Sequence, residues 1–261
     1  MASIGVERTF LVDAASFALS AGLVARIPAA LARPSPLPAD PAAGASGVAH
    51  YWQDFLDGLR TLVRRPLLRD IAVIVLIFNA LDAARFLVLL PLYSLDRLGG
   101  ASAAGLITGA LAGGSVAGAA LFSAWGHRLP RRTVFIVCFA LTGGPLSAAF
   151  LLQAPLGALV ALSAATGLSG GMLNPLINTL RLELTPPHLL ARVQSLMIAV
   201  AWAGIPVGSL LAGVAADRVA VPTVFGIVGG LYVLTALVPL AGPSWRLMER
   251  PSAPRGTPSS G

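Results

Sequence analysis

The chain has 261 residues, of which 56% are hydrophobic and only 11% are charged. A soluble domain carries roughly 25% charged residues because its surface faces water. This composition therefore excludes an ordinary soluble protein and indicates an integral membrane protein. The 18 basic residues are all arginine and face 11 acids, for a formal net charge of +7. Such an excess in a soluble protein would suggest nucleic-acid binding, but membrane topology explains it here, and we expect no nucleic-acid partner.

A membrane-spanning helix needs about 20 mostly apolar residues, because the hydrocarbon core of a bilayer is about 30 Å thick. Seven runs in the sequence reach or approach this length, and together they predict an all-α, polytopic bundle of seven transmembrane helices embedded in a lipid bilayer. In chain order the runs are Phe10–Ile27, Ile71–Leu95, Gly105–Trp125, Thr133–Leu152, Leu156–Leu180, Val193–Ala216 and Val221–Ala241.

These runs divide the chain into four parts. Residues 1–27 hold the first predicted helix, and residues 71–241 hold the other six. Residues 28–70 form a predicted cytoplasmic linker, and residues 242–261 a predicted disordered tail. Within the linker, Tyr51–Leu67 has apolar residues at helical spacing opposite charged ones. This pattern fits a helix on the membrane surface and, equally well, a helix packed on the neighbouring loop.

The arginines predict the orientation of the chain. Arginine accumulates in the cytoplasmic loops and flanks of membrane proteins, and most arginines here lie in the linker, in every second loop and in the tail. Only Arg8, Arg97 and Arg218 flank the opposite ends, and Arg85 lies within a helix. We therefore expect a multi-pass protein of the plasma membrane with its N-terminus outside and its C-terminus in the cytoplasm.

Glycine recurs at four-residue spacing in several of the predicted helices. Small residues at this spacing line one helix face and let a neighbouring backbone approach closely, so we expect tight packing along these faces. The glycines concerned are Gly105, Gly109, Gly113, Gly114 and Gly118 in one helix, and the pairs Gly167 and Gly171, Gly204 and Gly208, and Gly226 and Gly230 in three others.

Prolines also fall inside the predicted helices. Each can remove a helical hydrogen bond and kink its helix, and such kinks serve rocking and gating in transporters. A mechanical role and simple tolerance of proline in a large bundle are equally compatible with the sequence. The prolines are Pro91, Pro145, Pro175, Pro206 and Pro222.

The most informative polar cluster lies in the second predicted helix. Asn79, Asp82 and Arg85 follow one another at three-residue spacing, which places them on one helix face. Asp82 falls near the middle of the span, where a charge is costly unless it is paired or hydrated. One interpretation makes Asp82 a proton-coupling or cation-sensing carboxylate, with Arg85 tuning its affinity for protons. The alternative is a self-neutralising pair that only stabilises the bundle.

Two asparagines in the fifth predicted helix are further candidates for the same site. Asn174 and Asn178 lie one turn apart beside Pro175, so they either line the same cavity or only form hydrogen bonds between helices. Asp13 lies close to the start of the first predicted helix and is expected to have a structural role at the membrane interface.

One enzymatic hypothesis follows from the sequence around Ser169. Gly167-Leu168-Ser169-Gly170 matches the pattern around the nucleophile of rhomboid intramembrane proteases. A serine nucleophile needs a base within hydrogen-bond reach, yet His188 lies 19 residues further on, about 28 Å along a helix at about 1.5 Å per residue. We therefore expect no enzymatic activity. The sequence also contains no metal-binding or nucleotide-binding motif, and no cofactor is expected.

Five segments together carry a resemblance to a known family: Glu7–Phe17, Leu89–Tyr93, Trp125–Arg132, Pro186–Val193 and Gly204–Gly213. In this order they resemble helix six, the outer end of helix seven, the second loop signature, the loop between helices ten and eleven, and helix eleven of major facilitator superfamily exporters. The resemblance is strongest to the transmembrane secretion effector branch, which includes enterobactin-exporter-like and macrolide-efflux-like proteins. Ala191 stands where glycine is commoner in the family.

The resemblance implies a major-facilitator-like bundle that corresponds to helices six to twelve, without the first five. It implies proton-coupled export of a small amphiphilic molecule such as a drug or a siderophore, with Gly126, Arg128, Arg131 and Arg132 in a cytoplasmic gate loop. Because these transporters bind substrate between two six-helix bundles, a chain with one bundle is expected to need an N-terminal half or a second copy of itself. The alternative is a non-transporting remnant, or a membrane subunit that functions only with another chain.

Overall fold

The computed structural model of the protein describes residues 6–26, 56, 59–60 and 62–249. The chain divides into two compact units, Met1–Gln53 and Asp54–Gly261. The first unit contains α1, Val6–Ala25, which begins slightly before the predicted Phe10–Ile27. Its described apolar stretch, Ala14–Ala25, is shorter than a membrane span.

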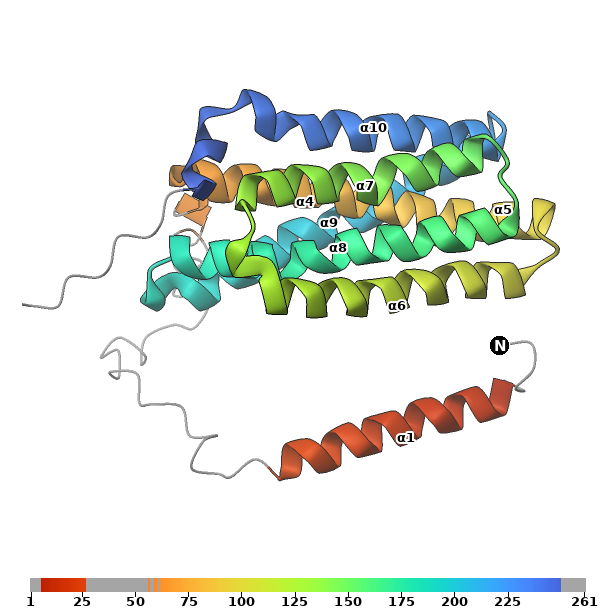
Figure 1. Ribbon diagram of the computed structural model, residues 1–261, viewed down its shortest axis with the longest axis horizontal. Coiled ribbons are helices and arrows are strands. Elements are labelled where there is room, and N and C mark those ends of the chain that lie inside the picture. The colour runs from red at the N-terminus through yellow and green to blue at the C-terminus, as the bar shows by residue number, and fades with distance from the viewer. Residues whose placement is uncertain (1–5, 27–55, 57–58, 61, 250–261) are drawn as a thin grey trace, which may run out of the picture. The chain divides into compact units, whose positions relative to one another are not determined.

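The second unit contains six helices that are long and apolar enough to cross a membrane, and they run side by side in a bundle (Figure 1). The first is continuous over Pro66–Arg97 and consists of α4 (Pro66–Asp82), a π-helical segment η1 (Ala83–Leu89) and α5 (Leu90–Arg97). The other five are α6 (Ala101–Trp125), α7 (Arg131–Leu151), α8 (Leu156–Leu184), α9 (Leu190–Ala216) and α10 (Val221–Ala241). The predicted all-α membrane bundle is confirmed, with six spans and the shorter apolar helix α1 in place of seven full spans.

Most of the spans are longer than the apolar runs that predicted them. In α7, for example, Arg131 and Arg132 extend the helix beyond its apolar part. A search for apolar runs does not include such polar or charged residues. Short 3₁₀ turns at Gly126–Arg128 (η2) and Pro187–Leu189 (η3) join α6 to α7 and α8 to α9. These turns lie at the same end of the bundle as the start of α4, and we refer to this as the arginine-rich end.

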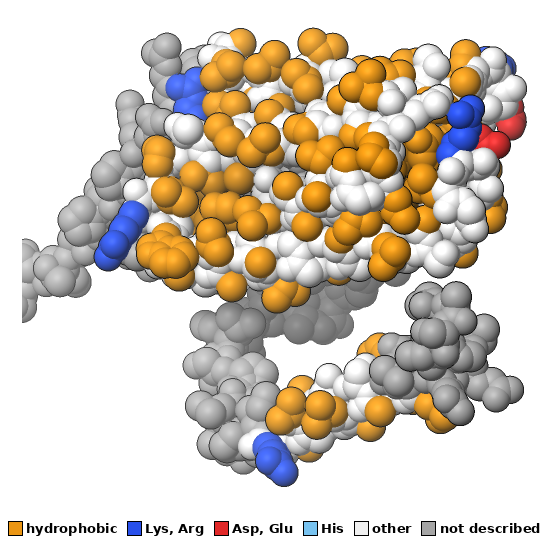
Figure 2. Space-filling model, turned by 45° about the vertical axis from the view of Figure 1, so that its right-hand side comes forward, with side chains coloured by type: hydrophobic (Ala, Val, Ile, Leu, Met, Phe, Trp, Pro, Cys, Tyr) orange, Lys and Arg blue, Asp and Glu red, His pale blue; other side chains and the backbone are white. Residues whose placement is uncertain are grey.

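The bundle has a hydrophobic exterior as well as a hydrophobic core. In the face seen in Figure 2, hydrophobic side chains cover the middle and charged side chains lie toward the two ends. Large apolar residues along the spans, such as Trp202 and Leu210 on α9, are exposed. Inside, aromatic rings of different helices pack together, among them Phe150 on α7 and Phe225 on α10, whose centroids are 4.1 Å apart. An apolar surface of this kind suits a lipid environment.

The glycine patterns explain the closest helix contacts. On α6, a Cβ at Gly114 or Gly118 would overlap backbone atoms of α8, and a Cβ at Gly167 or Gly171 of α8 would overlap the backbone of α6. Gly204 and Gly208 of α9 lie in the same way against the backbone of α4. The predicted tight packing is confirmed at these six positions.

Other glycines do not make such contacts. A Cβ at Gly105, Gly109, Gly113 or Gly230 would meet no atom within 4 Å. The prediction of close packing is therefore wrong for Gly105, Gly109 and Gly113 of α6. The contact with α8 runs along the other face of α6, which carries Gly114 and Gly118. Gly226 differs again, since its neighbours are side-chain atoms of Leu151.

The prolines fall into two groups. Pro145, Pro175 and Pro206 lie inside continuous α-helices, so a role in kinking or gating stays a prediction. Pro91 lies at the start of α5 but inside the helix that is continuous over Pro66–Arg97, so its kink also stays a prediction. Pro222 lies in the first turn of α10. For Pro222 the predicted loss of a helical hydrogen bond is wrong, because the N–H groups of a first turn have no partner within the helix.

The C-terminal segment is partly ordered, contrary to the predicted disordered tail of residues 242–261. Pro243–Glu249 forms a 3₁₀ helix, η4, in which Trp245 and Met248 are buried in the core. The Trp245 ring packs on Phe135 with centroids 5.2 Å apart, and the Ser244 hydroxyl donates to Asp70 Oδ2 at 2.6 Å. Composition does not reveal these anchors, because proline, serine, glycine and arginine make up most of the segment around them. Residues 250–261 lie outside the described part of the chain.

The predicted amphipathic helix over Tyr51–Leu67 lies largely outside the described residues, as does most of the linker. In its described part, Leu62 is buried in the core while Leu56 and Val63 are exposed. Pro66 and Leu67 already belong to α4.

Candidate functional site

A cavity of about 420 Å³ lies within the bundle. Its walls come from α4, η1, α6, α7, α8 and α9, and they combine aromatic and aliphatic side chains with a few polar groups. The apolar walls include Phe78, Phe86 and Phe139. The polar side chains include Asn79, Asp82, Arg85 and Asn174. Ligand sites for small molecules commonly have this mixture of an apolar lining and a few convergent polar groups.

The structure brings four of the five predicted site residues together around this cavity. Asn79, Asp82 and Arg85 come from the first span, and Asn174 comes from α8 beside Pro175. The Asn79 amide donates to the Val75 carbonyl at 3.0 Å, so one of its donors is satisfied within its own helix.

Asn178 is not among the residues that line this cavity. Its side-chain oxygen accepts a hydrogen bond of 2.5 Å from Arg181 Nη2 on the exposed side of α8. Asn178 lies one turn further along α8 than Asn174 and outside the lining of this cavity, and its part in the site stays a prediction.

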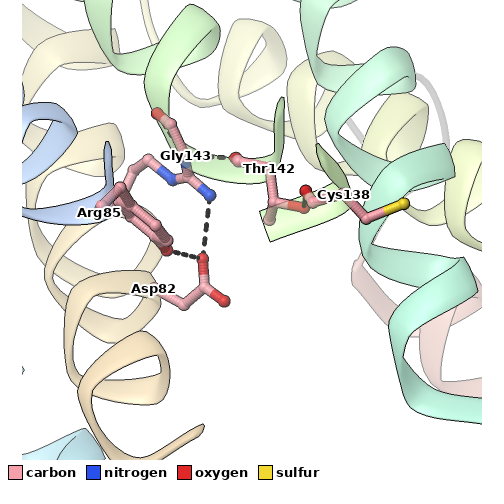
Figure 3. Close-up of polar contacts among 6 residues, drawn as sticks. Asp82, Arg85, Cys138, Thr142 and Gly143 are labelled. Atoms are coloured by element: carbon pink, nitrogen blue, oxygen red, sulfur yellow. Dashed lines mark hydrogen bonds and ion pairs between the residues drawn. The ribbon is translucent and has the colours of Figure 1, made fainter. Parts of the chain in front are cut away.

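Arg85 is fully buried and its charge is compensated on several sides (Figure 3). Its Nη2 donates to Asp82 Oδ1 at 2.9 Å, and its Nη1 donates to the Thr142 carbonyl on α7 at 2.9 Å. The guanidinium carbon lies 4.5 Å from the centroid of the Phe86 ring and 4.7 Å from that of Tyr232. Cation–π contacts of this kind are strongest where water is excluded.

Asp82 differs from its partner in exposure. Its side chain is 42% exposed, whereas that of Arg85 is 0% exposed, and Asp82 lines the cavity. The pair therefore presents its carboxylate to the cavity while the guanidinium is enclosed by protein. This asymmetry is what distinguishes the site from a fully buried structural ion pair.

Tyr232 on α10 is the residue that sequence reasoning missed. Its hydroxyl donates to Asp82 Oδ1, and its ring meets Phe78 edge-on at 4.8 Å between centroids. The only signal in the sequence was one tyrosine, besides Thr223 and Thr235, in an otherwise apolar run. Nothing local connects that hydroxyl to a carboxylate 150 residues earlier.

The π-helical segment begins directly after Asp82 and carries both Arg85 and Phe86. At its end the Leu90 N–H donates to the Arg85 carbonyl, five residues earlier, which is the hydrogen-bond pattern of a π-helix. Segments of this kind inside α-helices are frequent at functional sites. The widened turn changes the helical phase of the residues that follow Asp82, an effect that regular spacing does not predict.

The predicted gate-loop residues lie at the arginine-rich end. Arg131 forms a bidentate ion pair with Glu183 of α8, with N–O distances of 2.6 and 2.9 Å. Arg132 donates to the carbonyls of Pro239 and Leu240 at the end of α10. Gly126 lies against the Phe122 ring, and Arg128 is exposed. Arg131 and Arg132 thus join the end of α7 to the ends of two neighbouring helices.

Ser169, the residue of the protease-like pattern, is engaged within its own helix. Its hydroxyl donates to the Ala165 carbonyl at 3.0 Å, a local hydrogen bond common for serine in membrane helices. The side chains of His188 and Asp13 lie outside the described part of the structure.

Comparison with known proteins agrees with the resemblance noted in the sequence. Multidrug efflux pump Tap of Mycobacterium tuberculosis and that of Mycobacterium bovis are each 29% identical to the chain over 249 residues, which are 95% of this chain and 57% of the relative. The Tap pump of Mycolicibacterium fortuitum is 28% identical over 199 residues, 76% of this chain and 48% of the relative. The chain thus spans about half the length of the curated relatives it matches. No solved structure gives a significant match.

The family comparison covers most of the chain. The model of the Major Facilitator Superfamily matches residues 72–261, a range that includes all of the cavity-lining residues and nearly all of the six spans. With six membrane-length helices among the described residues, the chain is a multi-pass membrane protein. It belongs to the Major Facilitator Superfamily.

Proposed function

We propose that this protein takes part in proton-coupled export of a small amphiphilic molecule, drug-like or siderophore-like, and that Asp82 is the coupling group. The observation that carries this proposal is the exposed carboxylate of Asp82 in a cavity whose walls are otherwise largely apolar. A proton and a cationic group on the substrate would compete for that carboxylate. Binding of one would then favour release of the other.

The walls of the cavity favour an amphiphilic ligand with a positive charge. Phe78, Phe86 and Phe139 offer apolar and aromatic surface, while Asn79 and Asn174 offer amide groups that can orient a polar substituent. Arg85 would attract anions if it were exposed, but its guanidinium is buried and compensated. Among the described residues that line the cavity, the accessible charge is therefore negative.

We further propose that the cavity works together with a second bundle. Major facilitator transporters alternate access by rocking two bundles about a substrate at the midplane, and this chain spans 57% of the length of its Tap relatives. A second copy of the chain or a separate N-terminal half would supply the other wall. In this arrangement the arginine-rich end faces the cytoplasm, and the Arg131–Glu183 pair stabilises one state of the gate.

Transport by the purified chain tests this function. The chain is reconstituted in liposomes with an imposed pH gradient, and movement of ethidium, a fluorescent amphiphilic cation, is followed by fluorescence. We expect wild-type protein to move ethidium in response to the gradient and Asp82→Asn to fall to the level of protein-free liposomes. Asp96→Asn is the matched control, because Asp96 lies on the same continuous helix but is 70% exposed and pairs with Arg97.

Two results would change this assignment. Equal pH-driven transport by wild type and Asp82→Asn would show that Asp82 is not the coupling group. A wild-type chain that is folded yet moves no ethidium under any gradient would exclude transport by copies of this chain alone. It would favour a non-transporting remnant or a subunit that works only with another chain, such as a separate N-terminal half.

A further inference from the structure

The two carboxylate oxygens of Asp82 have different surroundings. Oδ1 accepts hydrogen bonds from Arg85 Nη2 and from the Tyr232 hydroxyl. Among the described residues, none donates a hydrogen bond to Oδ2. Because the side chain is 42% exposed and lines the cavity, Oδ2 is the oxygen left for a proton or a ligand.

Tyr232 is held rigidly in the position from which it reaches Oδ1. The residue is fully buried on α10, with its ring between Phe78 and the guanidinium of Arg85. On the α7 side the ring fills the space beside Gly143, where a Cβ would overlap ring atoms. The Gly143 carbonyl in turn lies 3.4 Å from Arg85 Nη1. Four helical segments, α4, η1, α7 and α10, therefore meet around the Tyr232 side chain.

We propose that Tyr232 is a positioning residue for the coupling carboxylate. Its hydroxyl and Arg85 together occupy Oδ1, so that Oδ2 alone exchanges a proton or a cationic substrate with the cavity. This inference rests on the proposed function of Asp82 and adds to it a residue from a helix that does not line the cavity.

The Tyr232 hydroxyl and Arg85 Nη2 both donate to Oδ1, so removing the hydroxyl frees one of the two contacts that hold the carboxylate. The charged residues that line the cavity are Asp82 and Arg85, and the lining residues from α6, α7, α8 and α9 are uncharged. From α10, Tyr232 is the ionisable group that contacts Asp82. The Tyr232 hydroxyl can therefore be removed without altering any other charge around the carboxylate.

Labelling with dicyclohexylcarbodiimide tests the proposal without requiring transport. This reagent adds to protonated carboxyl groups in apolar surroundings and leaves a stable N-acylurea, which mass spectrometry locates at Asp82, with Asp82→Asn as the blank. We expect Asp82 to be labelled several-fold faster in Tyr232→Phe than in wild type at the same pH, because one hydrogen bond that holds the carboxylate is lost. Tyr93→Phe is the matched control, because Tyr93 is also fully buried but packs against Phe150 and Phe225.

An unchanged labelling rate in Tyr232→Phe would overturn the proposal, and so would a wild-type Asp82 that is not labelled at any pH, since a cavity-facing Oδ2 must be reachable. If Tyr232→Phe does not fold, infrared pH-difference spectra of the wild type decide the question. The proposal requires the carboxyl band of Asp82 and a tyrosine band to change together, and both to be absent from Asp82→Asn. Transport that survives Asp82→Asn would instead remove the proposed function and leave the hydrogen-bond geometry intact.

Discussion

Replacing Gly208 with alanine is expected to destabilise the bundle markedly, whereas replacing Gly213 on the same helix is not. A Cβ at Gly208 would overlap the carbonyl oxygen of Ala80, so α9 and α4 would have to separate. A Cβ at Gly213 would meet no atom within 4 Å. Overpacking a core typically destabilises by about 1–3 kcal/mol, and we expect the upper part of this range because the obstacle is backbone rather than a flexible side chain.

The melting temperature of each variant in detergent measures this difference. It is determined by heating samples and quantifying the remaining folded protein by size-exclusion chromatography. Both variants gain the same methyl group and the same increase in helix propensity, so only the local contact distinguishes them. Ala80 lies two residues before Asp82, and we expect the Gly208 variant to disturb the candidate site as well. Equal melting temperatures for the two variants would contradict the observed contact between α4 and α9.

The second large effect concerns the ion pair itself. Asp82→Ala leaves the guanidinium of Arg85 fully buried without its carboxylate. Breaking a fully buried pair destabilises by about 3–5 kcal/mol, and this value is an upper bound here because Asp82 is 42% exposed. The hydrogen bond to the Thr142 carbonyl and the two aromatic rings remain, so we expect a loss near the lower end of that range. The double variant Asp82→Ala with Arg85→Met also removes the unpaired positive charge of Arg85. It leaves an apolar side chain of similar length at position 85.

We therefore expect the double variant to be more stable than Asp82→Ala alone. Thermal or denaturant unfolding of the two proteins in the same detergent checks the order, with Asp96→Ala as an exposed control. If the double variant were less stable than Asp82→Ala, Arg85 would stabilise the fold independently of Asp82. The unpaired charge of Arg85 would then not be the cause of the lower stability of Asp82→Ala.

Much of the fold follows from the sequence because lipid imposes simple requirements. Each span must be a helix of sufficient length and apolar content, and six of the seven apolar runs form such helices. The glycine spacing identifies helices that pack closely, yet it does not choose the face, as Gly105 and Gly109 show. That choice depends on the partner helix, which is distant in the sequence.

The candidate site was predictable mainly where its residues share a helix, and Asn174 on α8 is the predicted lining residue that comes from another helix. Asn79, Asp82 and Arg85 lie within two turns of one another, so their cluster is visible as a spacing. The contribution of Tyr232 depends on how α10 packs against the first span. The π-helical turn is equally invisible to a pattern of regular period, and the buried Trp245 shows that an anchoring side chain can lie within a segment whose composition is typical of disorder.

Competition between a proton and a cationic ligand at Asp82 is the central claim, and proton release on binding tests it most directly. Purified chain in weakly buffered detergent solution is titrated with ethidium over a series of pH values while the pH is recorded. We predict that wild-type protein releases protons as ethidium binds and that Asp82→Asn releases none. Ethidium binding to the wild type without proton release at any pH, or equal release from Asp82→Asn, would contradict this coupling mechanism.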